Sequence, residues 1–228
     1  MRVLAIDTAL AACSAAVLDT AHGGLLASES LAMVRGHAEA LMPLLDRVMK
    51  RSGIAFHDLD RVVVTTGPGS FTGLRVGISA ARGVGLAMNI PVVGVSTLSA
   101  YASPYLAADD RIPVVAAIDA RHEHVYLQVF GAGGRTLIAP RLAALSEAIA
   151  AASEASARIV GSAAQAIADK LSKAAASPAF VDPRGAPDIG WIAQLGAIVP
   201  EVTSPPKPQY LRAPDAQPQN AASLPRRC

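Results

Sequence analysis

The segment of residues 67–85 constrains the fold of this chain more than any other part, because it places several glycines where a helix is expected. It follows an apolar, β-branched run at residues 62–66, so the order strand, glycine turn, helix is predicted. Each glycine inside a helix costs about 0.8–1 kcal/mol relative to alanine. Small residues recur along one face of this helix at every fourth position, at Gly73, Gly77, Ala81 and Gly85. Another backbone can approach such a face closely, and packing there must offset the cost of the glycines.

The same glycine turn has some features of a phosphate-binding loop. Free amides and the dipole at a helix N-terminus favour an anion. No lysine follows Gly73, however, as a P-loop requires, and Thr72 stands where a dinucleotide-binding turn has its third glycine. A tight turn followed by close helix packing is therefore favoured, and a phosphate site is the alternative.

Composition excludes several classes of protein. The 228 residues are 52% hydrophobic and 17% charged, which is typical of an α/β protein with a sizeable core. A net charge of +2 is too small to predict direct nucleic-acid binding. Two cysteines make no disulfide framework, and no apolar stretch approaches the length of a membrane span. We therefore expect a cytoplasmic protein with no membrane partner.

The chain divides into two halves with the same order of elements. We predict an N-terminal half at residues 1–108, a C-terminal half at 109–204 and a proline-rich tail at 205–228. Each half is expected to contain roughly three strands, a helix, a strand and a helix. In the first half we predict strands at 2–8, 13–19, 25–32, 61–66 and 92–95, and helices at 37–51, 71–88 and 97–106. In the second half we predict strands at 113–119, 124–130, 135–139 and 158–160, and helices at 146–153 and 162–172.

This repeated order indicates an internal duplication. Residues 3–7 and 115–119, which open the two halves, agree at four of five positions and both end in aspartate. The helix at 37–51 is amphipathic, with an apolar stripe that is expected to face the core: Leu41, Leu44, Leu45, Val48 and Met49.

Four segments together resemble the TsaB (YeaZ) family, which belongs to the actin-like and sugar-kinase-like (ASKHA) class of duplicated α/β folds. They are residues 6–8, 67–75 (GPGSFTGLR), 94–98 and 210–212. The resemblance is dense over the first hundred residues and loose afterwards. It implies a non-catalytic scaffold subunit that pairs with a homologous, catalytic TsaD-like subunit and works with a TsaE-like ATPase. The complex makes threonylcarbamoyladenosine beside the anticodon of tRNA, so tRNA would be reached only through the complex.

The resemblance, together with the helical patterns, predicts a partner interface on the two N-terminal helices. Its predicted residues are His37, Ala38, Met42, Met49, Phe71, Thr72, Gly73, Leu74, Arg75, Gly77, Ile78, Ala81, Arg82 and Gly85. Without the partner, this surface is expected to pair with a second copy of the chain. No cofactor of its own is expected, although an adenine nucleotide at the boundary with the partner is a further expectation.

In actin-like enzymes, the aspartate that opens each half flanks nucleotide phosphates and metal. The corresponding residues predict a vestigial nucleotide site made of Asp7, Thr8, Gly67, Gly69, Ser70 and Asp119. No glycine follows Asp119 in the second half, so a close phosphate approach is hindered there. The alternative interpretation is an enzyme, a nucleotide-dependent phosphotransferase or carbamoyltransferase that uses Asp7, Thr8 and Asp119.

No metal site is predicted. TsaD-like proteins hold metal with two histidines four residues apart on a helix, but Leu41 stands four residues after His37. His122 and His124 could face one side of a strand, but no third ligand is evident.

Overall fold

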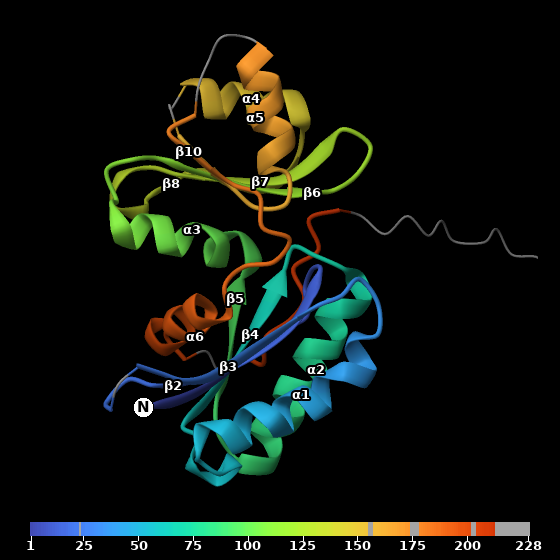
Figure 1. The fold of residues 1–228 in the computed structure, drawn as a ribbon, viewed down its shortest axis with the longest axis vertical. Coiled ribbons are helices and arrows are strands. Elements are labelled where there is room, and N and C mark those ends of the chain that lie inside the picture. The colour runs from blue at the N-terminus through green and yellow to red at the C-terminus, as the bar shows by residue number, and fades with distance from the viewer. Residues whose placement is uncertain (23, 155–156, 174–177, 202–203, 213–228) are drawn as a thin grey trace, which may run out of the picture.

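The computed structural model of the chain describes residues 1–22, 24–154, 157–173, 178–201 and 204–212. It forms two lobes, each built around one five-stranded sheet, and the first half of the chain supplies the lower sheet in Figure 1. No helix among the described residues is long and apolar enough to span a bilayer.

The lower sheet has the order β3-β2-β1-β4-β5. Strands β1 to β3 form an antiparallel meander, while β4 and β5 run parallel to β1. Both faces of β1, β2 and β4 are buried, which explains their nearly continuous apolar sequences. The bounds are β1 (Arg2–Asp7), β2 (Ala12–Asp19), β3 (Gly24–Ala32), β4 (Arg61–Gly67) and β5 (Val92–Ser96).

The upper sheet repeats this topology strand for strand, in the order β8-β7-β6-β9-β10. Its meander is antiparallel, and β9 and β10 run parallel to β6. The bounds are β6 (Val114–Asp119), β7 (His124–Phe130), β8 (Thr136–Ala144), β9 (Arg158–Val160) and β10 (Phe180–Asp182). The predicted α/β duplication is therefore confirmed, and the matching pentapeptides occupy the central strand of each sheet.

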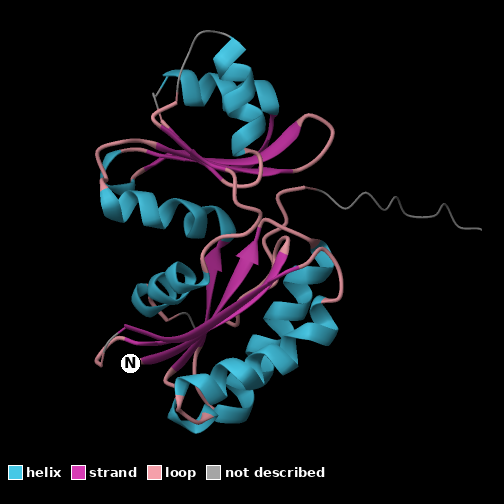
Figure 2. Cartoon of the chain, in the orientation of Figure 1, coloured by secondary structure: helices cyan, strands magenta, loops and turns pink. Residues whose placement is uncertain are grey.

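Helices cover both faces of each sheet (Figure 2). Helices α1 (His37–Ser52) and α2 (Phe71–Met88) lie side by side on one face of the lower sheet, and α6 (Ile189–Ile198) covers the other. Helices α4 (Leu145–Glu154) and α5 (Ala164–Lys173) cover the outer face of the upper sheet, and α3 (Thr97–Ala108) lies on its inner face.

The last helix of each half crosses to the sheet of the other half. Helix α3 follows β5 but packs mainly on β6, and α6 follows β10 but packs on β1, β2 and β4. A corresponding arginine holds the C-terminus of each crossed helix. Arg61, which opens β4, donates to the carbonyl oxygens of Gly196 and Val199 at 2.8 Å each. Arg158, which opens β9, donates to those of Tyr105 at 2.6 Å and Asp109 at 3.0 Å.

The predicted order was incomplete in the second half. Strand β10 and helix α6 were not predicted. The predicted order of three strands, helix, strand and helix is therefore wrong for the second half, because it ends at α5. The full unit continues with one more strand and one more helix, as it does in the first half.

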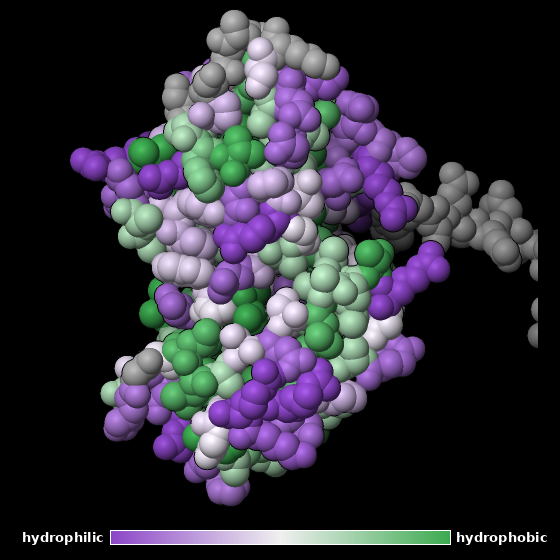
Figure 3. Space-filling view, in the orientation of Figure 1, coloured by the Kyte–Doolittle hydropathy of each residue, from purple (hydrophilic) through white to green (hydrophobic). Residues whose placement is uncertain are grey.

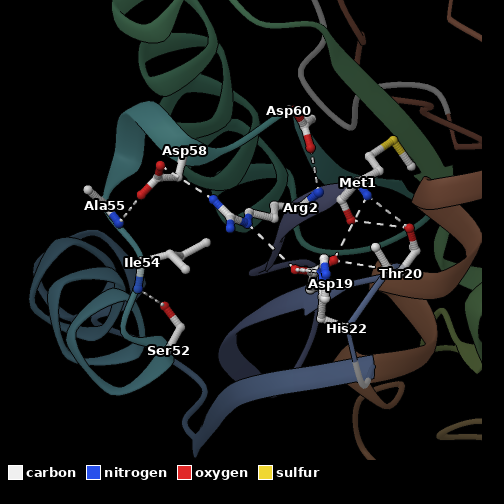
Figure 4. A network of polar contacts seen from close by, with 11 residues as sticks. Met1, Arg2, Asp19, Thr20, His22, Ser52, Ile54, Ala55, Asp58 and Asp60 are labelled. Carbon is white, nitrogen blue, oxygen red and sulfur yellow. Dashed lines mark hydrogen bonds and ion pairs between the residues drawn. The ribbon is translucent and has the colours of Figure 1, made fainter.

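A polar network closes the end of the lower sheet that lies away from the upper lobe (Figure 4). The Arg2 guanidinium lies between Asp19, at 3.5 Å, and Asp58 of a short 3-10 turn (Phe56–Asp58), at 3.3 Å. The amino ends of β1 and β4 are fixed there, so their carboxyl ends point toward the other lobe. A second 3-10 turn (Ala132–Gly134) precedes β8.

Candidate functional site

The carboxyl end of β1 places Asp7 below the cleft between the lobes. The side chain is completely buried. Its Oδ1 accepts hydrogen bonds from the Thr65 hydroxyl at 2.5 Å and from the Ala9 amide at 3.0 Å. No described residue bonds to Oδ2. Burial raises the pKa of this carboxyl above its ordinary value.

The loop before α2 lies directly over the turn that follows Asp7. The Ser70 amide donates to the carbonyl oxygen of Ala9 at 2.7 Å, and the Thr8 hydroxyl donates to that of Gly73 at 2.7 Å. A Cβ atom added to Gly69 would overlap the Ala9 carbonyl oxygen. The chain itself therefore fills the space above Asp7 and Thr8.

Asp119 makes the same turn at the end of β6 but stays exposed. Its Oδ1 accepts from the Arg121 amide at 2.8 Å, as that of Asp7 accepts from Ala9. The next three residues, Arg121, His122 and Glu123, all have left-handed backbone conformations, with φ of 63°, 52° and 58°. Such conformations are strained for residues other than glycine. His122 thus lies in a turn rather than on a strand, and the prediction that His122 and His124 share one strand face is wrong.

The two aspartate turns border a cleft of about 630 Å³ between the lobes. Of the six residues predicted for a vestigial nucleotide site, Gly69, Ser70 and Asp119 line this cleft. Asp7, Thr8 and Gly67 are buried instead. Residues 209–212 of the tail form part of the lining. The residues therefore do not fit an actin-like nucleotide: one aspartate is covered, and neither turn offers a row of free glycine amides.

The described residues include no group of three histidine, cysteine, aspartate or glutamate side chains arranged to hold a metal ion. His37 is buried, and its Nε2 lies 3.1 Å from the carbonyl oxygen of Leu10. This contact ties the start of α1 to the turn between β1 and β2.

The small-residue face of α2 packs on the chain's own sheet. A Cβ atom on Gly73 would overlap the Thr8 carbonyl oxygen, and one on Gly85 would overlap a methyl group of Val92. The predicted close approach is therefore real, but the neighbouring element belongs to the same chain. The prediction that these positions contact a partner is wrong for the eight residues that are buried: His37, Met49, Gly73, Leu74, Gly77, Ile78, Ala81 and Gly85.

Six predicted interface residues remain exposed: Ala38, Met42, Phe71, Thr72, Arg75 and Arg82. Arg47, on the opposite flank of α1, binds Glu29 of β3, so Ala38 and Met42 lie on the flank toward α2. Leu86, which is 86% exposed, is a further apolar side chain on α2, near its C-terminal end. Figure 3 shows hydrophobic and hydrophilic residues side by side on the visible face of the lower lobe. We call these seven residues the α1–α2 surface.

Comparisons with known proteins agree with this geometry. A family model described as TsaD, tRNA N6-adenosine threonylcarbamoyltransferase, matches residues 23–185. The tRNA threonylcarbamoyladenosine biosynthesis protein TsaB of Escherichia coli (strain K12) is 38% identical over 126 residues, which is 55% of this chain and 53% of that protein. This chain thus matches about half the length of that relative.

Two further proteins match nearly the whole chain. An uncharacterized protein of Mycobacterium bovis is 34% identical over 218 residues, 95% of this chain and 94% of that one. A crystal structure of a Pseudomonas aeruginosa protein, described as similar to peptidase YeaZ, has a TM-score of 0.75 and 27% identity. It covers 92% of this chain and 99% of its own.

Proposed function

This chain belongs to the TsaD family and, within it, to the TsaB (YeaZ) group, and from that premise we propose that it serves tRNA threonylcarbamoyladenosine biosynthesis as a subunit without an active site of its own. The E. coli relative named for this biosynthesis supports the pathway.

The observation that carries the non-catalytic role is the burial of Asp7. A carboxylate that binds a phosphate-bound metal or moves a proton must reach the cleft, but the loop at residues 67–70 covers this one. The raised pKa of Asp7 has the same cause, so it accompanies a structural position and does not by itself indicate catalysis. Asp119 is then alone in the cleft, without its counterpart from the other half.

The α1–α2 surface supports a partner of the same fold. Identical subunits in a two-fold dimer pair through the same face, and a homologous subunit of the same fold has a corresponding face to offer. Met42, Phe71 and Leu86 are each more than half exposed, at 58%, 51% and 86%. Large apolar side chains exposed on two neighbouring helices are a feature of protein interfaces. We therefore propose that a TsaD-like subunit binds here, with a TsaE-like ATPase joining the assembly and tRNA bound only by the assembly.

Two further proposals follow for the isolated chain. Without the TsaD-like subunit, a second copy would cover the α1–α2 surface, giving a weak homodimer that the partner dissolves. The chain would need no cofactor of its own, and an adenine nucleotide would bind only where the two subunits meet.

The test is the affinity of the purified chain for the TsaD-like subunit of the same organism, measured by calorimetry. Met42→Asp places a charge in the apolar surface and should weaken binding at least tenfold. Leu137→Asp changes an apolar side chain of similar exposure, 47%, on β8 of the upper lobe, and should leave affinity unchanged. If the unmodified chain, Met42→Asp and Leu137→Asp all bind with equal affinity, the α1–α2 surface is not the binding site.

A further inference from the structure

The described part of the tail, residues 204–212, lies against α2 and joins the two lobes; we call it the C-terminal strap. Its Tyr210 ring stacks on Phe71 of α2, with ring centroids 5.3 Å apart. The Arg75 guanidinium lies 3.9 Å from the centre of the Phe71 ring, and its Nε donates to the Tyr210 hydroxyl at 3.2 Å. The three side chains form one stack that is still open to solvent, with Tyr210 45% and Phe71 51% exposed.

The strap is held in place from the lower lobe. The Gln209 amide donates to the carbonyl oxygen of Thr66 at the end of β4, at 2.7 Å. Arg82 of α2 donates to the carbonyl oxygen of Pro206 at 2.5 Å. A Cβ atom on Gly67 would come within 2.9 Å of the Gln209 carbonyl oxygen, so a glycine is needed where the strap passes.

The upper lobe holds the other end of the strap. Leu211 packs against the apolar cluster that joins α3 to β6, and Arg212 donates to the carbonyl oxygen of Ala120 at 3.0 Å. A segment fixed at both ends loses little conformational freedom when it binds something else. The Tyr210 ring is therefore presented in a defined position.

The charged side chains of α2 and of the strap are all cationic. Arg75, Arg82 and Lys207 are exposed, and neither α2 nor residues 204–212 contain an aspartate or glutamate. A complementary partner would place carboxylates opposite these cations and apolar groups opposite the aromatic stack. Aromatic and arginine side chains are also the ones that dominate binding energy at interfaces.

We propose that the C-terminal strap is the third element of the partner-binding surface, beside α1 and α2, with Tyr210 as its anchor. This inference rests on the proposed function, because the occupant is the same homologous subunit, here expected to present an apolar face with acidic side chains. Phe71 and Arg75, which belong to the α1–α2 surface, contact Tyr210 directly, so the strap adjoins that surface at the start of α2. Pro205 and Leu86 also border a cavity of about 570 Å³ at the start of the strap.

The experiment compares aromatic variants in the same calorimetric assay with the TsaD-like subunit. Tyr210→Ala should weaken binding at least tenfold, while Tyr210→Phe, which keeps the ring, should stay within about threefold of the unmodified chain. Phe180→Ala is the matched control, because Phe180 is an aromatic residue of similar exposure, 47%, away from the strap. Its ring packs on that of Tyr105, with ring centroids 5.4 Å apart. It should leave affinity unchanged. Raising the salt concentration should weaken binding, and less so for Arg75→Gln.

Hydrogen exchange provides a second measurement. Leu211→Ala removes the apolar contact of the strap with the upper lobe and changes no residue of the α1–α2 surface. It should speed exchange of the Gln209 amide and weaken partner binding together. If Met42→Asp weakens binding but Tyr210→Ala and Leu211→Ala do not, the strap is outside the interface and the inference is wrong while the proposed function stands. If none of these variants changes affinity, the proposed function fails as well.

Discussion

At the scale of single residues, two glycines of α2 predict opposite results for the same substitution. Gly73→Ala should destabilise the chain by about 1–3 kcal/mol, because the new Cβ would overlap the Thr8 carbonyl oxygen. Gly83→Ala should stabilise it by about 0.5–1 kcal/mol, because nothing lies within 4 Å of the added atom. Urea denaturation measures both. Equal stability of the two variants would contradict the close packing of Gly73 on Thr8 and the open space at Gly83.

Asp7 predicts a second effect at this scale, on the pH dependence of stability. Its pKa is raised from 3.8 in the folded chain, so the folded state binds more protons than the unfolded state above that pH. Its contribution to stability is therefore largest below about pH 3.8 and is lost as pH rises through the folded pKa. Asp7→Asn should abolish this loss and be at least as stable as the unmodified chain at pH 7. Denaturation from pH 4 to 8 tests this, and a variant much less stable at pH 7 would show that the carboxylate itself is needed.

At the scale of elements, the two arginines that bind the crossed helices predict equivalent losses. Arg61→Ala should free the C-terminus of α6, and Arg158→Ala should free that of α3. Each should cost about 1.5–3 kcal/mol, the usual range for hydrogen bonds made by a charged group. Amide exchange should rise in α6 for the first variant and in α3 for the second. Arg135→Ala is the control, since that exposed side chain has no hydrogen-bond partner among the described residues. A uniform rise of amide exchange over the whole chain in either variant would show that Arg61 or Arg158 does not act locally on its helix.

Some helices and strands could be predicted from the sequence alone, and others could not. Amphipathic α1 and the apolar central strands were predicted closely, because one face or both faces contact a core. Helix α6 was missed because it is packed between the lower sheet and α3, so its sequence is apolar nearly all round and lacks a helical period. Strand β10 has only three residues. The glycine stripe of α2 correctly predicted a close approach, but spacing could not say whether that backbone belonged to this chain or a partner.

At the scale of the whole molecule, duplication explains both the fold and the proposed loss of chemistry. Each half ends its central strand with an aspartate in the same turn, as a two-sided nucleotide site would require. The chain then covers one of the two with its own loop and lines the cleft with its own strap. The sequence identified residues 210–212 only through their resemblance to the TsaB family. The contacts of the strap with Phe71, Thr66 and Ala120 could not be predicted, since they depend on the final placement of both lobes.

The most direct test of the central claim is the amount of threonylcarbamoyladenosine in tRNA from E. coli cells depleted of their own TsaB, measured by mass spectrometry after nucleoside digestion. Cells would carry this chain together with the TsaD-like and TsaE-like subunits of the same organism, with the chain unmodified, as Asp7→Asn or as Met42→Asp. A partner subunit without its own active site predicts that the unmodified chain and Asp7→Asn restore the modified nucleoside and that Met42→Asp does not. Restoration by Met42→Asp together with complete failure of a folded Asp7→Asn chain would contradict the account and indicate an enzyme that uses Asp7.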